Sequence, residues 1–293
     1  MQSIKLRIGI NHCLTGNNDL RYNGEPLSDG FVQDTLCKYA NWIPVCLEIE
    51  TDHIHQTLGC QSEHINDLSK KHLDGFILTS NSPRNDSFRP KVGLSKAGTS
   101  ASNDMGVFAR SLSLNYPALP IEENDRLYDP LIRENFLERI FTSKRWNIAF
   151  SNSFTPHALI QFHSSHKFLF MSHSVSLYQE MGRLVARSGL LTLAELKDRY
   201  VVLMSSSLKQ MATPKKHANV MQHIMGFLKG LIDADEKKEI VETIDQYRTG
   251  QVPWIVPITL LNLHLRKNSV ADWVLNQTYL NPYPAELMLR NIV

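Results

Sequence analysis

The sequence predicts two domains: an N-terminal α/β domain with a parallel sheet and a C-terminal α-helical domain. Up to about residue 145, short apolar runs alternate with helical patterns, as is typical of a parallel sheet covered by helices. After Trp146 the strand-like runs stop and helical periodicity continues to the end of the chain. We therefore expect the domains at residues 1–147 and 148–293.

Within the α/β domain we expect a doubly wound sheet of about four strands. Three apolar runs have the length and composition of strands, namely 5–10, 43–46 and 75–78. Apolar residues at helical spacing predict helices between them. These helices are expected at 29–40, from residue 51 or 52 to about 71, at 103–115 and at 130–142.

The second domain shows helical periodicity in six segments. These segments are 155–172, 174–188, 192–211, 214–232, 235–249 and 254–267. A further short helix is expected after the sequence NPYP at 281–284, because proline favours the start of a helix and disfavours its interior. No strand pattern interrupts these segments, so this domain is predicted to be all-α.

Composition and charge narrow the class of protein. Of 293 residues, 42% are hydrophobic and 20% are charged, which suits a globular fold. No run of eighteen apolar residues predicts a membrane span, and the start has no signal-peptide pattern, so we expect a cytoplasmic protein. Residues 157–229 carry 9 Lys and Arg but only 3 Asp and Glu. Such a local basic excess is typical of a protein that binds polyanions.

Two cysteines follow predicted strands. Cys13 lies just after the first strand and Cys46 closes the second. Because parallel strands end at one edge of a sheet, both thiols are expected near each other, where they could hold a metal or a cluster. The alternative is that both are small buried apolar residues. Cys37 and Cys60 fall inside predicted helices and are expected to be packing residues.

Five motifs occur in the first domain in a fixed order. They are RIGINHCL at 7–14, RYNG at 21–24, PVCLE at 44–48, DGFIL at 74–78 and Ser82-Pro83. Together they resemble the thiouracil and 4-thiouridine desulfidases of the TudS type. The second domain resembles the helical YbgA-type domain that is fused to tRNA-directed members of the RudS type. The matching stretches there are residues 163–186, 213–229, 246–261 and 279–291.

The resemblance implies a 4Fe-4S cluster held by three cysteines, with one iron open to take sulfur from a thiolated base. The first two ligands match Cys13 and Cys46, and the glutamate of the family's Cys-Pro-Glu motif matches Glu48. Glu48 and Ser82 could form a catalytic acid/base pair; the favoured alternative is a helix-capping or surface carboxylate and a turn serine before proline. The third ligand position is Asn85, whose neutral amide is a poor donor for a cubane. The loop that forms the family's substrate pocket after the glutamate motif is also shortened.

Three functions follow from these departures. The preferred one is a degenerate relative of the tRNA desulfidases that binds tRNA and has an impaired cluster site. The second is an active desulfidase that yields uridine and hydrosulfide, with a third ligand such as Cys60 or a residue of a partner. The third is a non-enzymatic binding module for another ligand. The residues alone leave open whether the chain is an enzyme.

The resemblance implies tRNA as the partner, and basic side chains of this chain are the candidate contacts. Basic side chains bind phosphates without reading sequence. The candidates are Arg145, His166, Lys167, Arg183, Lys215 and Lys216. His163, His166 and Lys167 are spaced to share one helix face, which could face phosphates or be simply solvated.

Overall fold

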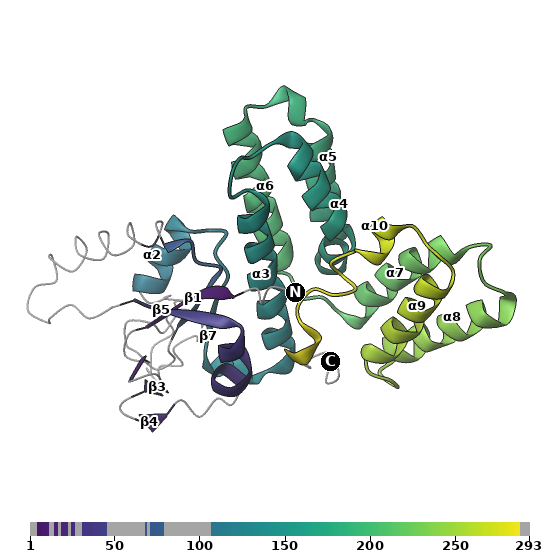
Figure 1. Ribbon diagram of the computed structural model, residues 1–293, viewed down its shortest axis with the longest axis horizontal. Helices are drawn as coiled ribbons and strands as arrows, with labels where there is room; N and C mark the ends of the chain where they lie inside the picture. The colour runs from purple at the N-terminus through teal and green to yellow at the C-terminus, as the bar shows by residue number, and fades with distance from the viewer. Residues whose placement is uncertain are drawn as a thin grey trace, which may run out of the picture. The chain divides into compact units, whose positions relative to one another are not determined.

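The computed structural model describes residues 5–11, 15–16, 19–22, 25–26, 31–45, 68, 71–78 and 107–287 (Figure 1). By its contacts the chain divides into two compact units, Met1–Tyr128 and Asp129–Val293. The sequence pattern places the division about twenty residues later, at 147 and 148. The helix α3 (Pro130–Ala149) accounts for this difference, because it packs against helices of the second unit.

The first unit contains the parallel sheet that the sequence predicts. Its four strands lie in the order β5-β1-β6-β7 and every neighbouring pair is parallel. The strands are β1 (Leu6–Asn11), β5 (Ala40–Val45), β6 (Gly75–Leu78) and β7 (Ile121–Glu123). The helix α2 (Val107–Asn115) precedes the last of them. The three-residue strand β7 was not predicted, because so short a run has no measurable period.

Chain order and sheet order diverge at β1. This strand lies between β5 and β6, so the connections run in opposite directions on its two sides. In open α/β sheets, ligands bind at the carboxyl ends of the strands where the order reverses in this way. Strands β1 and β5 end side by side, since Asn11 pairs with Val45. The sequence continues from these two ends into Cys13 and Cys46.

Two local features of the first unit differ from the sequence-based expectation. The helix expected at 29–40 is a π-helical turn, Phe31–Thr35, followed by a 3₁₀ turn, Leu36–Lys38, because β5 already begins at Ala40. A small antiparallel set of strands was not expected; it comprises β2 (Thr15–Gly16), β3 (Asp19–Tyr22) and β4 (Glu25–Pro26). The helix expected to begin near residue 51 lies almost entirely outside the described residues.

The centre of the sheet is packed closely. Leu6, Ile8 and Ile10 of β1 are all fully buried. A β-carbon placed on Gly9 would lie 2.3 Å from Cδ2 of Phe76 on the neighbouring strand, so the ring occupies the space of the missing side chain. The glycine is therefore required by packing against Phe76.

The second unit is helical, as predicted. Its helices after α3 are α4 (Pro156–His173), α5 (Val175–Ala186), α6 (Leu193–Leu208), α7 (Pro214–Met225), α8 (Ala234–Arg248), α9 (Ile255–Lys267) and α10 (Asp272–Leu275). The predicted segments match α4 to α9, and the last short helix is the 3₁₀ turn Ala285–Leu287. Among the described residues, no helix has the length and apolarity needed to cross a membrane.

Aromatic side chains join the first helices of this unit. The ring of Trp146 on α3 stacks on Tyr200 of α6, with centroids 5.6 Å apart, and meets Phe162 of α4 edge to face at 5.2 Å. Such pairs contribute about 0.5–1.5 kcal/mol each beyond their buried area. Helix α4 also contacts α5 and α7. It therefore links the helices α3 to α6 with the helices α7 to α10 (Figure 1).

Candidate nucleic-acid interface

A basic pocket of about 590 Å³ lies among α4, α5 and α7. Lysine is the main charged residue there, and none of the described residues that line the pocket is Asp or Glu. The lining residues are Lys167, Met171, Val175, Tyr178, Gln179, Lys215, Lys216, Asn219 and His223. Three of the six predicted contacts, all lysines, are thus brought together, and we call this site the lysine pocket.

Two helix N-termini border the lysine pocket. Helix α7 begins with Pro214, and the hydroxyl of Thr213 caps it by accepting from the backbone N–H of Lys216 at 3.4 Å. Helix α5 is capped by Ser174, whose hydroxyl accepts from Leu177 N–H at 3.4 Å. The positive end of each helix dipole therefore adds to the lysine charges. Both contributions favour an anion in this pocket.

The three lysines are held to different degrees. The ammonium group of Lys216 donates to the carbonyl oxygens of His173, at 2.7 Å, and Met211, at 2.9 Å. Lys167 Nζ lies 5.0 Å from the ring centroid of Phe168, a cation–π distance. Lys215 is exposed. Lys216 is therefore fixed in position, whereas Lys215 projects into solvent, where it can reach a ligand.

The prediction that His163, His166 and Lys167 share a helix face open to phosphates or solvent is wrong for the two histidines. Both histidines are buried, at 9% and 3% exposure, so this face does not present imidazoles to solvent. His163 Nδ1 lies 3.0 Å from the Tyr200 hydroxyl, and His166 Nδ1 donates to the carbonyl of Phe162 at 2.8 Å. The helical spacing was read correctly, but aromatic side chains pack over the two rings.

Burial also keeps these two histidines uncharged. It lowers the pKa of His163 to about 4, with a smaller contribution from the charge of Lys167. It lowers the pKa of His166 to about 3, assisted by the nearby charge of Arg145. A neutral, buried imidazole offers little to a phosphate. His166 therefore belongs to the core in this structure and does not line the lysine pocket.

The two predicted arginine contacts lie apart from the lysine pocket. The half-buried Arg145 donates through its guanidinium to the backbone carbonyl of Pro282, so it tethers the C-terminal segment to α3. Arg183 is exposed on α5 and lines a separate groove between α5 and α6. Helix α5 thus borders both sites.

Part of the lysine pocket was not among the six predicted contacts. Asn219 and His223 line it one and two helical turns beyond Lys215, a spacing of four and eight residues that places them on the same face of α7. That spacing was readable in the sequence. Tyr178 and Gln179 of α5 also line the pocket, and their part depends on how α5 packs beside α4, which no local pattern predicts.

The candidate cluster site of the first unit belongs to a part of the chain that the structure does not describe. Cys13, Cys46, Glu48, Ser82 and Asn85 all lie outside the described residues. The alternative ligand, the cysteine at position 60, lies there too. The resemblance implies three thiolate ligands, whereas this chain has Cys13, Cys46 and, at position 85, a neutral amide that is a poor donor for a cubane.

The structure therefore defines an α/β unit followed by a helical unit with a lysine-lined pocket. Residues 167–284 match a family described as a protein of unknown function, DUF1722. The chain is also 29% identical over 165 residues to the uncharacterized protein YbgA of Escherichia coli (strain K12), a match that covers 54% of this chain and 94% of YbgA. No solved structure matches. Over about half of its length, the chain is therefore similar to YbgA.

Proposed function

We propose that the helical unit binds RNA, with tRNA as the partner, and that the lysine pocket holds a backbone phosphate. The observation that carries this proposal is the convergence of Lys167, Lys215 and Lys216 in one pocket whose described lining has no carboxylate. All three lysines were expected from the sequence to contact nucleic acid. Phosphate contacts supply most of the affinity of nucleic-acid binding without reading sequence.

Positive charge is not spread evenly over the surface of the helical unit. Helix α8 carries Asp233 at its cap and Asp235 and Glu236 in its first turn, so its surface repels phosphates. The basic excess lies instead in residues 157–229, which span α4 to α7 and carry 9 Lys and Arg but only 3 Asp and Glu. A localised basic site orients a polyanion on one face of the unit.

Reversal of one charge tests this proposal. We expect K215E to weaken binding of total tRNA about five- to tenfold in a filter-binding or anisotropy titration. Lys215 is exposed and its substitution leaves the core intact. The matched control is K237E, an equal charge change at an exposed position of α8, which should leave the affinity unchanged. If both variants weaken binding equally, the effect of K215E reflects net charge and not a contact in the lysine pocket, and the proposal is refuted.

For the first unit we propose a desulfidase-like sheet with an impaired cluster site. The switch point at β1, beside β5 and β6, is where such a fold places its chemistry. The donor set of Cys13, Cys46 and Asn85 is what argues for impairment. Iron and acid-labile sulfide should therefore stay well below one cluster per chain after anaerobic reconstitution and desalting.

The alternative is an active desulfidase in which Cys13 and Cys46 would hold a cluster that supplies an open iron for sulfur, while Glu48 and Ser82 would move protons. The adjacency of the ends of β1 and β5 favours it, because the two thiols follow paired residues. A stable cluster near one per chain would support this alternative and would direct attention to Cys60 as the third ligand.

A further inference from the structure

A second hollow of the helical unit lies between α5 and α6 and has a different character. Its volume is about 720 Å³, within the range of pockets that hold small organic molecules. Its walls are mostly apolar, with charged residues along the sides. They are Glu180, Arg183, Leu184, Arg187, Leu190, Leu191, Asp198, Arg199, Val202 and Leu203. We call this site the α5–α6 groove.

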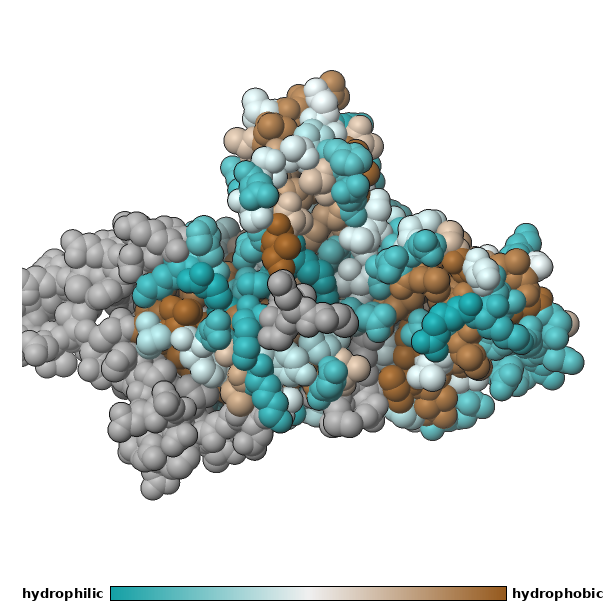
Figure 2. Space-filling view, viewed as in Figure 1, coloured by the Kyte–Doolittle hydropathy of each residue, from teal (hydrophilic) through white to brown (hydrophobic). Residues whose placement is uncertain are grey.

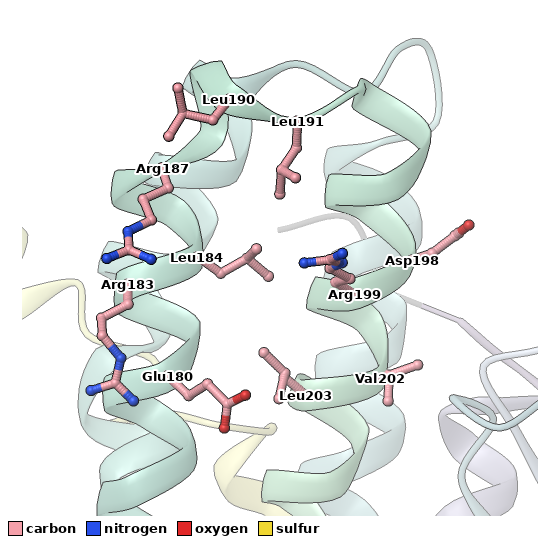
Figure 3. Close-up of a pocket in the computed structure, with 10 residues that line it drawn as sticks. All are labelled: Glu180, Arg183, Leu184, Arg187, Leu190, Leu191, Asp198, Arg199, Val202 and Leu203. Carbon is pink, nitrogen blue, oxygen red and sulfur yellow. The ribbon is translucent and has the colours of Figure 1, made fainter.

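In Figure 3 the side chains that point into the groove are mostly leucines, whereas Arg183 and Arg187 of α5 point outward along its border. Leu184, Leu191 and Leu203 point into the space between the two helices. Arg199 lies at the α6 edge of the same space, whereas Asp198 points away from it. Figure 2 shows apolar surface at the free end of α5 and α6, flanked by hydrophilic side chains, and Leu190 there is 81% exposed. An exposed apolar site of this kind marks a binding surface.

The two arginines of α5 give the groove an anion-binding border. Arg183 and Arg187 are one helical turn apart, and both are exposed. Within the described part of the chain, neither forms an ion pair with a carboxylate, whereas Arg199 pairs with Glu195 at 2.6 Å. A guanidinium without an ionic partner is suited to a phosphate, which it can bind through two parallel hydrogen bonds.

We propose that the α5–α6 groove receives an unstacked nucleotide of the bound RNA. This inference rests on the proposed RNA-binding function. The base would lie against the leucines and beneath the Arg199 guanidinium, with its phosphates on Arg183 and Arg187. Proteins recognise single-stranded RNA by stacking splayed bases on aromatic rings or guanidinium planes. Glu180, which points into the groove, can accept a hydrogen bond from an N–H of the base edge.

The position of the groove relative to the lysine pocket supports this occupant. Both sites are bordered by α5: Gln179 lines the lysine pocket and Glu180 and Arg183 line the groove. Gln179 and Arg183 are one helical turn apart, about 6 Å along the axis. An RNA strand whose phosphate lies in the lysine pocket therefore needs only to cross α5 to place a base in the groove.

The test compares single-stranded with double-stranded RNA. We would measure the affinity of the full chain for an oligouridine of about eight nucleotides and for a duplex of equal length. The first variant is V202D, because Val202 lines the groove and is 50% exposed, so that an aspartate there is tolerated by the fold. The control is V241D, at a 40% exposed valine of α8.

We expect V202D to weaken the single strand about tenfold and to leave the duplex unchanged, because duplex bases stay stacked. K215E should weaken both, and V241D neither. Unchanged single-strand binding by V202D, with K215E still effective, would overturn the groove proposal alone. Absence of RNA binding by the unaltered protein would overturn the proposed function as well. A change in the sedimentation of free V202D would identify the groove as a contact between copies and would also overturn the proposal.

Discussion

His173 Nε2 lies 3.0 Å from Glu138 Oε2, and both side chains are almost completely buried. The atoms are at ion-pair distance without the alignment of a hydrogen bond. The other ring nitrogen of His173 donates to the carbonyl of Gln210 at 2.7 Å. The backbone carbonyl of His173 accepts from Lys216 in the lysine pocket. This pair therefore connects α3 to the residue that supports the proposed phosphate site.

Removal of Glu138 should destabilise the helical unit. The substitution E138A removes a buried carboxylate that lies beside the His173 imidazole and leaves unfilled space in the core, which typically costs about 1–3 kcal/mol in free energy of unfolding. Urea denaturation followed by circular dichroism measures the loss. The exposed pair of Arg248 and Asp245 is the control, since R248A should cost less than about 1 kcal/mol. A similar loss in both variants would show that the buried pair adds no special stability.

Acid should destabilise the folded chain through His163 and His166. Their folded-state pKa values, lowered to about 4 and about 3, lie below the ordinary value of 6.5. As the pH falls below 6.5, the two histidines therefore become protonated in the unfolded chain but stay neutral in the folded chain. The contribution of the two neutral histidines to the free energy of unfolding is fully present above that pH. It decreases toward pH 4, by up to about 1.4 kcal/mol per pH unit for each histidine.

The variant H166N isolates one of these contributions. Its amide can still donate to the Phe162 carbonyl, as the imidazole does, but it has no titratable group. Denaturation curves at several pH values should show a shallower pH dependence than in the unaltered protein. An unchanged slope between pH 6.5 and 4 would mean that His166 is not protonated on unfolding in this range.

The salt dependence of RNA binding should report the number of lysine contacts. Each neutralised phosphate contributes about 0.7–0.9 to the slope of log affinity against log salt. K215A should therefore reduce the slope by about this amount, because it removes one exposed positive charge from the lysine pocket. Anisotropy titrations at several salt concentrations measure it, with K237A as the control on α8. A slope equal to that of the unaltered protein would exclude Lys215 as a phosphate contact.

Substitution of Gly9 should disturb the sheet of the first unit. In G9A the new methyl group would meet the ring of Phe76 and also lie 2.9 Å from Leu73, so the core must shift. Overpacking of this kind typically costs about 1–3 kcal/mol. Gly226 is the matched control, because a β-carbon there has nothing within 4 Å. Hydrogen exchange of β1 and β6 should accelerate in G9A but not in G226A, and equal protection in both would contradict the packing argument.

The sequence predicted the parts of the fold that depend on local periodicity. Segments such as 155–172 and 254–267 became α4 and α9 with ends within a residue or two, because a 3.6-residue period and capping residues are local signals. The same period placed His166 and Lys167 on one helix face. It did not show that the rings of Phe162 and Phe170 pack against the His166 imidazole. The α5–α6 groove was missed for a similar reason, since a gap between helices depends on packing between segments distant in sequence.

Replacement of Asn85 with cysteine should test whether one lost ligand explains the proposed impairment of the cluster site. With Cys13 and Cys46 already in the sequence, N85C restores three thiolates, the donor set that the desulfidase resemblance implies. Iron and sulfide after anaerobic reconstitution should then rise toward one cluster per chain. N85S is the control, because it changes the same position without adding a thiolate. If N85C gains no more iron than N85S, the deficiency extends beyond that position, and the shortened loop after Glu48 becomes the next segment to restore.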